Sequence, residues 1–134
     1  MTAHIKIANA VASLKDAKAQ PDYGKELDMQ IAAHGLPKML AEFHFAAPLR
    51  QWRSDRAYVE LKLLFEIEGG AFVQGRHTRG VGYSNDIEKY NAAQMMGYKV
   101  FRLSPAMCSE KDGRALALIK RAYYNAMAER EATK

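Results

Sequence analysis

The spacing of hydrophobic positions along this chain changes from a helical period to a strand period and back. Apolar residues three and four apart predict helices over residues 4–19 and 24–34, the second of which ends before Gly35. The helical spacing returns near the C-terminus and predicts a final helix that begins at Pro105 or Ser109. Its apolar stripe comprises Ala115, Leu118, Ile119, Ala122, Tyr123 and Ala126.

Between the helical regions, short runs rich in aromatic and branched residues predict strands. The runs are residues 40–46, 55–59, 61–68 and 98–103. We expect the second and third to pair antiparallel through a tight connection around Glu60. The third leads through a glycine-rich loop, residues 69–83, and a helix to the fourth. This strand–helix–strand order implies a right-handed parallel crossover.

The crossover helix is predicted over residues 86–96, with Asn85 as its N-cap and Gly97 as its stop. The helical period places a set of four residues on one face of it and Asp86 and Lys89 on another. The four are Ile87, Tyr90, Asn91 and Gln94.

The predicted order is helix, helix, three strands, helix, strand, helix. It is typical of an α/β (α+β) fold, a mixed sheet of about four strands flanked by helices. The chain has 134 residues, which is enough for one domain with a core and too few for two. We expect a single domain over 1–134, with residues 1–36 as an N-terminal helical part and 40–103 as its core.

Three carboxylates are expected to gather at the end of the central strand pair. Residues two apart on a strand share a face, so Glu66 and Glu68 lie together on an otherwise apolar strand. Burying them unpaired is costly, and a bound cation is the usual compensation. Asp55 on the paired strand would complete an oxygen ligand set that suits Mg²⁺ or Mn²⁺. The alternative is that these acids serve only in ion pairs with neighbouring arginines.

Basic side chains flank these acids in the sequence. The net charge of +5 favours a polyanionic partner, although a basic protein without such a partner fits the charge equally well. An arginine fork matches the geometry of phosphate. The candidate phosphate contacts are Arg53, Arg56, Arg76, Arg79 and Lys89. The alternative interpretation is a solvated basic turn followed by an ordinary basic loop. Glu42 is a candidate accessory acid, or simply a residue on the solvent face of an edge strand.

Several function classes are excluded by the residues present. Cys108 is the single cysteine, so an internal disulfide and the Cys₄ and Cys₂His₂ zinc patterns are ruled out. The glycine-rich loop carries neither a phosphate-binding P-loop motif nor a dinucleotide fingerprint. With no signal peptide and no apolar run of membrane-spanning length, we expect a cytoplasmic protein without a membrane partner. A homodimer is left open.

The order and spacing of these motifs resemble those of the PD-(D/E)XK nuclease superfamily. The sequence is most similar to very-short-patch-repair (Vsr-like) endonucleases and to small phage and bacterial domains related to them. The resemblance covers residues 40–103. It is carried by R-S-D at 53–55, E-I-E-G-G at 66–70, G-R-H at 75–77 and D-I-E-K-Y-N-A-A-Q-M-M-G-Y-K-V-F-R-L at 86–103.

The resemblance implies a restriction-endonuclease-like fold that hydrolyses DNA phosphodiester bonds with Mg²⁺ (or Mn²⁺), in a bacterial cell or a phage-infected host. Asp55 takes the place of the first acid of the motif and Glu66 that of the second. Glu68 stands where the signature lysine would be, and would share the metal or orient water. His77 falls near a catalytic loop histidine of some Vsr-like enzymes. The structural zinc site of Vsr enzymes is absent, so mismatch specificity is not implied.

Two other interpretations stay open. The missing lysine is compatible with a DNA-binding module of the same fold without catalysis. A small basic nuclease could also be structure-selective, for example a Holliday junction resolvase, and act in DNA repair, recombination or phage DNA processing.

Overall fold

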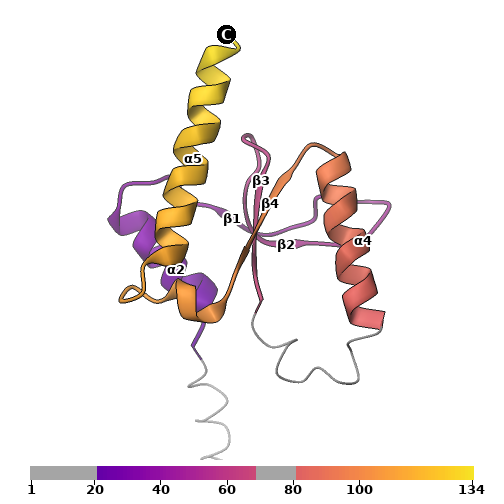
Figure 1. The fold of residues 1–134 in the computed structure, drawn as a ribbon, viewed down its shortest axis with the longest axis horizontal. Helices are drawn as coiled ribbons and strands as arrows, with labels where there is room; N and C mark the ends of the chain where they lie inside the picture. The colour runs from indigo at the N-terminus through magenta and orange to yellow at the C-terminus, as the bar shows by residue number, and fades with distance from the viewer. Residues whose placement is uncertain (1–20, 69–80) are drawn as a thin grey trace, which may run out of the picture.

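The computed structural model describes residues 21–68 and 81–134, and in these ranges a four-stranded mixed sheet carries helices on both faces (Figure 1). The elements are α2 (Tyr23–Ala33), β1 (Leu40–Phe43), β2 (Ser54–Tyr58), β3 (Leu63–Ile67), α4 (Val81–Met95), β4 (Lys99–Leu103), the 3₁₀ helix η1 (Pro105–Cys108) and α5 (Arg114–Ala132). The strand order is β1-β2-β3-β4, with β1, β2 and β3 antiparallel and β3 parallel to β4. The predicted mixed α/β class is thereby confirmed.

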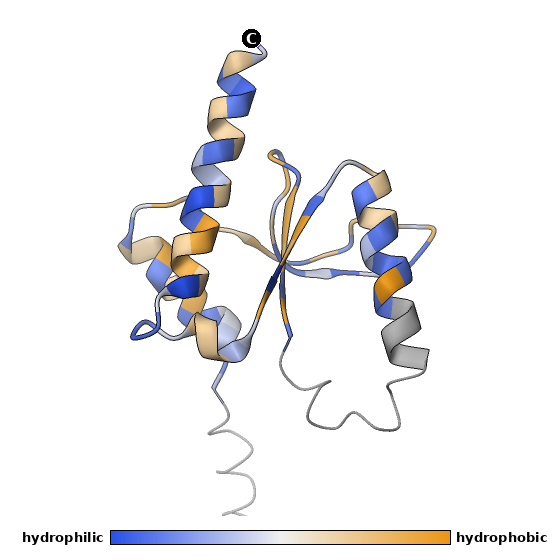
Figure 2. Cartoon of the chain, viewed as in Figure 1, coloured by the Kyte–Doolittle hydropathy of each residue, from blue (hydrophilic) through white to orange (hydrophobic). Residues whose placement is uncertain are grey.

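The larger hydrophobic core lies between the sheet and helices α2 and α5. Leu27 and Ile31 of α2 and Ile119 of α5 are almost fully buried against Leu63 and Phe65 of β3. Figure 2 shows hydrophilic and hydrophobic residues alternating along the turns of α5. Of the predicted stripe, Ala115, Ile119, Ala122 and Ala126 are buried, and Leu118 and Tyr123 pack at the edge of the core.

Helix α4 covers the opposite face of the sheet (Figure 1). The hydrophobic core on this side is small. It consists mainly of Ala57 of β2, Leu64 of β3, Ala93 of α4 and Phe45 from the turn after β1. Phe45 stacks on Trp52 with ring centroids 6.5 Å apart.

Three predicted boundaries are corrected by the structure. Helix α4 begins at Val81, so Asn85 lies inside it, where a helical backbone excludes the extended conformation of an N-cap. Residues from Pro105 form only a 3₁₀ turn, since Gly113 adopts a left-handed backbone (φ 74°) and α5 starts after it. Strand β1 ends at Phe43 rather than residue 46, next to Glu42 with its positive φ of 50°. The helix predicted over 4–19 and most of the 69–83 loop lie outside the described ranges.

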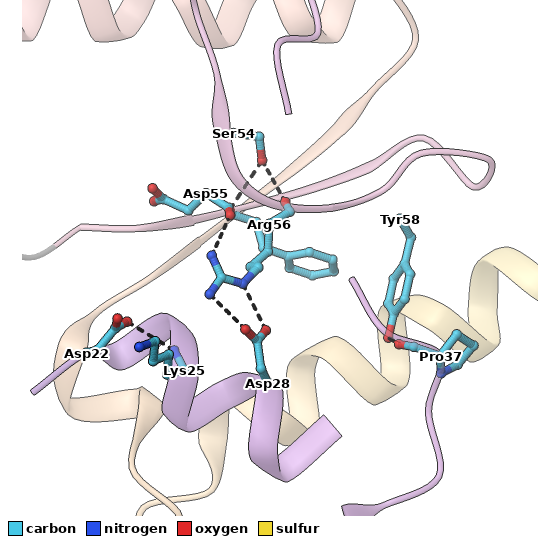
Figure 3. Close-up of polar contacts among 9 residues, drawn as sticks. Asp22, Lys25, Asp28, Pro37, Ser54, Asp55, Arg56 and Tyr58 are labelled. Atoms are coloured by element: carbon cyan, nitrogen blue, oxygen red, sulfur yellow. Dashed lines mark hydrogen bonds and ion pairs between the residues drawn. The ribbon is translucent and has the colours of Figure 1, made fainter. Parts of the chain in front are cut away.

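Arg56 ties helix α2 to the sheet. Its Nε and Nη2 each donate to the Asp28 carboxylate at 2.9 Å, and its Nη1 donates to the Asp55 carbonyl oxygen at 2.8 Å. Figure 3 shows this side chain reaching toward α2, away from the Asp55 carboxylate. Only 12% of the side chain is exposed. The prediction that Arg56 contacts phosphate is therefore corrected, because its donors are used to join two elements of the fold.

Gly24 of α2 makes this junction possible, and its substitution is expected to weaken it. A Cβ at Gly24 would overlap Nη2 of Arg56 and lie 2.9 Å from Cζ. Gly→Ala within a helix ordinarily stabilises by up to about 1 kcal/mol. Here we expect Gly24→Ala to destabilise by about 1–2 kcal/mol, because the guanidinium must give up its charged hydrogen bonds to Asp28. Urea unfolding monitored by circular dichroism measures the free energy of unfolding of the variant and of the wild-type protein.

The control is the same substitution in an Arg56→Met background. With the guanidinium removed, Gly24→Ala should become neutral or stabilising. An equal loss of stability in both backgrounds would contradict the steric explanation.

Candidate functional site

Asp55 and Glu66 meet at one end of the β2–β3 pair. The register pairs Arg56 with Phe65 and Ala57 with Leu64, and its extension by one residue sets Asp55 opposite Glu66. Both side chains lie on the face covered by α4, because Arg56 and Phe65 point to the other face. Oδ2 of Asp55 accepts a hydrogen bond from the Ile67 backbone N–H at 2.7 Å. This bond holds the Asp55 carboxylate across the end of β3.

Helix α4 delivers a lysine to the second acid. Nζ of Lys89 lies 2.9 Å from Oε1 of Glu66. Both side chains are largely enclosed, with exposed fractions of 15% for Lys89 and 8% for Glu66. Lys89 was predicted to contact phosphate and to lie on a different face of α4 from Tyr90. The predicted face is corrected, because Lys89 pairs with a buried carboxylate of the sheet, on the side where Tyr90 and Ala93 also lie. A phosphate contact by Lys89 stays a prediction.

The environment of Glu66 opposes its negative charge. Burial, the largest effect, raises the pKa of Glu66 from its ordinary 4.5 to about 7. The ammonium of Lys89 lowers this pKa, whereas the adjacent Asp55 carboxylate raises it through its charge and hydrogen bonding. The site therefore holds two closely spaced carboxyl groups with one ammonium beside them, and an added positive charge would be stabilised there.

This raised pKa predicts a pH dependence of folding stability. The folded protein binds the Glu66 proton more tightly than the unfolded chain does, so the resulting stabilisation is complete below about pH 4.5 and is lost as the pH rises through about 7. Relative to Glu66→Gln, the wild-type protein should lose about 1–3 kcal/mol of unfolding free energy between about pH 5 and pH 8. Urea unfolding in EDTA measures this difference. A difference that is constant with pH, or that grows in the opposite direction, would contradict it.

Glu68 does not join the other two acids in one cluster. Arg102 of β4 binds its carboxylate with two donors: Nε contacts Oε1, and Nη2 lies 2.7 Å from Oε2. The hydroxyl of Tyr90 donates to Oε1 at 3.2 Å. Within residues 21–68 and 81–134, no group of three histidine, cysteine, aspartate or glutamate side chains is arranged to hold a metal ion. The structure thus brings together Asp55 and Glu66 and gives Glu68 an arginine partner.

The remaining predicted residues fall into two groups. Glu42 of β1 and Arg53, which immediately precedes β2, form an exposed ion pair at 3.8 Å. This agrees with the interpretation of Glu42 as a solvent-facing edge residue. Arg76, His77 and Arg79 belong to the part of the loop that the structure does not describe, so their assignments stay predictions.

Arg102 and Tyr90 were not predicted as site residues. Arg102 is paired with Glu66 in the parallel β3–β4 register, and its guanidinium carbon lies 5.1 Å from the centre of the Tyr90 ring. A signal for Arg102 existed, since the strand period places it on the same face as Val100, which packs under α4. The strand period and the predicted parallel pairing of the last two strands together would have placed Arg102 on the same face as Asp55 and Glu66.

No family model, curated protein or solved structure matches this chain. None of the described helices is both long and apolar enough to cross a lipid bilayer. The site geometry and the order of the sequence motifs therefore carry the functional proposal.

Proposed function

We propose that this protein is a metal-dependent endonuclease that hydrolyses phosphodiester bonds in DNA. The observation that carries the proposal is the convergence of Asp55, Glu66 and Lys89 at the end of the β2–β3 pair. Two carboxylates and one ammonium in a partly buried site can serve phosphoryl chemistry, which needs bound cations and hydrogen-bond donors around negatively charged oxygens. The net charge of +5 and the order of motifs in the sequence also favour DNA as the substrate.

The donor chemistry of Asp55 and Glu66 fits Mg²⁺ or Mn²⁺. Magnesium is commonly held in proteins by one or two carboxylates, with waters and substrate phosphates completing its shell. Lys89 already places a positive charge 2.9 Å from Glu66, so this side of the site accommodates a cation. When bound, the ion would stabilise negative charge on the phosphoryl group and activate a water molecule.

The protein side chains divide the other tasks. The hydrogen bond from the Ile67 N–H fixes the orientation of the Asp55 carboxylate. Lys89 reaches Glu66 from α4 and can donate a hydrogen bond to a phosphoryl oxygen or to the attacking water. The signature lysine of the motif is replaced by Glu68 in this chain. Lys89 would take over its part, because it places an ammonium group beside the second acid, Glu66. The hydrophobic core under α4 is small, and the polar side chains of Asp55 and Glu66 occupy the end of the β2–β3 pair beside it.

A cleavage panel tests the proposal. Purified protein should nick or cut DNA in Mg²⁺ or Mn²⁺ and leave it intact in EDTA. Duplex, flap and four-way junction substrates in the same panel would separate a structure-selective nuclease from one that acts on ordinary duplex. Absence of metal-stimulated cleavage on every substrate would overturn the proposal.

A DNA-binding module without catalysis is the second candidate function. It is favoured by the pairing of Glu66 with Lys89 and of Glu68 with Arg102, which balances both acids without an added ion. Calorimetric titration with Mg²⁺ separates the two functions. The nuclease should bind the ion in a manner that Asp55→Asn weakens, whereas the module should bind DNA and show no such Mg²⁺ site.

A further inference from the structure

Glu68, Arg102 and Tyr90 form a second charged group beside the two acids. The Glu68 carboxylate accepts hydrogen bonds from Nε and Nη2 of Arg102 and from the Tyr90 hydroxyl. The guanidinium also lies against the Tyr90 ring, 5.1 Å from its centre. Contacts from Glu68, which follows β3 directly, and from Tyr90 of α4 therefore fix the orientation of a side chain that is carried by β4.

The arrangement leaves part of the guanidinium available. Its bonds to Glu68 use one hydrogen on Nε and one on Nη2, and a guanidinium carries five N–H donors in all. Among the residues that the structure describes, Nη1 and the second Nη2 hydrogen have no bond partner. The Arg102 side chain is 51% exposed, whereas its Glu68 partner is 20% exposed. A half-exposed, oriented fork of this kind matches the oxygens of a phosphate group.

Arg102 also lies close to the site of the proposed chemistry. It is paired with Glu66 in the parallel register of β3 and β4. Asp55, Glu66 and Arg102 therefore follow one another across three adjacent strands, β2, β3 and β4, on the face covered by α4. A DNA strand with one phosphate near Asp55 and Glu66 would bring a neighbouring phosphate to Arg102.

We infer that Arg102 binds a phosphate of the DNA backbone, and that Glu68 is a positioning residue for Arg102 rather than a metal ligand. This inference rests on the proposed function, because it assigns a substrate contact to the same site. It changes the role predicted for Glu68, whose carboxylate uses its oxygens on Arg102 and Tyr90.

The salt dependence of DNA binding in EDTA tests the contact without requiring cleavage. Each phosphate neutralised on duplex DNA contributes about 0.9 to the slope of log affinity against log salt concentration. Arg102→Gln keeps a donor for Glu68 and removes the charge, so the slope should fall by about 0.9. Arg102→Lys should keep the slope and weaken binding, because the fork is lost. Arg114→Gln is the matched control, since Arg114 also grips a carboxylate, Asp112, in an exposed pair, and it should leave the slope unchanged.

Glu68→Gln tests the positioning role by Mg²⁺ calorimetry. A positioning residue predicts a Mg²⁺ affinity close to that of the wild-type protein, whereas a tenfold or greater loss would overturn this part of the inference. An unchanged salt slope in Arg102→Gln would overturn the phosphate contact. If the wild-type protein binds DNA but never cuts it, the proposed nuclease fails while the contact is still decided by the slope. If it cuts DNA and the slope does not move, only the contact fails.

Discussion

Asp55→Asn is expected to reduce DNA cleavage by at least about 10³-fold while leaving DNA binding within a few fold of wild type. The carboxylate supplies one of the two charges that would hold the divalent ion, and the ion accounts for several kcal/mol of transition-state stabilisation in such sites. The amide oxygen of asparagine can still accept the hydrogen bond from the Ile67 N–H, so the strand end should keep its structure. Single-turnover cleavage with saturating Mg²⁺ measures the rate, and binding in EDTA measures the affinity.

Glu66→Gln should show the same loss, because the two carboxylates act on one ion. The double variant should therefore be no worse than either single variant. Asp112→Asn is the matched control: Asp112 is bound by Arg114 in an exposed pair at the start of α5, on the side of the sheet away from α4. Cleavage by the Asp55→Asn, Glu66→Gln double variant at the wild-type rate would rule out these acids as the catalytic pair.

Lys89→Met is expected to slow cleavage by about 10²–10³-fold, a typical loss for one hydrogen-bond donor to developing charge. The substitution also leaves Glu66 without its cation, and the pKa of Glu66 should rise further because Lys89 now lowers it. Circular dichroism and DNA binding in EDTA would show that the fold and the binding surface remain. The single-turnover rate at saturating Mg²⁺ is the decisive measurement.

That rate separates a catalytic lysine from a purely structural one. If Lys89 only neutralises Glu66, a saturating divalent ion replaces it and the rate should match or exceed wild type. Lys89→Arg keeps the charge with a different shape and should recover part of the rate. Lys99→Met is the matched control, because Lys99 pairs with Glu129 at 3.3 Å in an exposed position, and it should cleave normally.

Much of the fold followed from local patterns. The strand period of two places Phe65 and Glu66 on opposite faces of β3, and both placements agree with the structure. Gly35 was predicted to end α2, and it has the left-handed backbone (φ 71°) that the prediction requires. The helical spacing of residues 24–34 places Leu27 and Ile31 on one stripe, and both are buried. These features depend on neighbours within a few positions, which the sequence displays directly.

The site was only partly predictable, for reasons visible in Lys89 and Arg56. Both were predicted as phosphate contacts, and a basic side chain is ordinarily exposed. Lys89 instead meets a buried carboxylate 23 positions earlier in the chain, and Arg56 meets Asp28, 28 positions earlier. A charged side chain becomes buried only when a partner of opposite charge is brought to it. No local period contains that information.

The sequence by itself determined the mixed α/β architecture, the pairing of β2 with β3, and the neighbouring placement of Asp55 and Glu66, because strand register and alternation are local properties of the chain. Only the tertiary structure decided which cation each acid receives. The packing of α4 over the sheet brings Lys89 into an ion pair with Glu66. The parallel pairing of β4 with β3 brings Arg102 into an ion pair with Glu68. These pairings join segments distant in sequence, and their geometry is set by how the helices and strands pack, so they appear only once the elements are assembled.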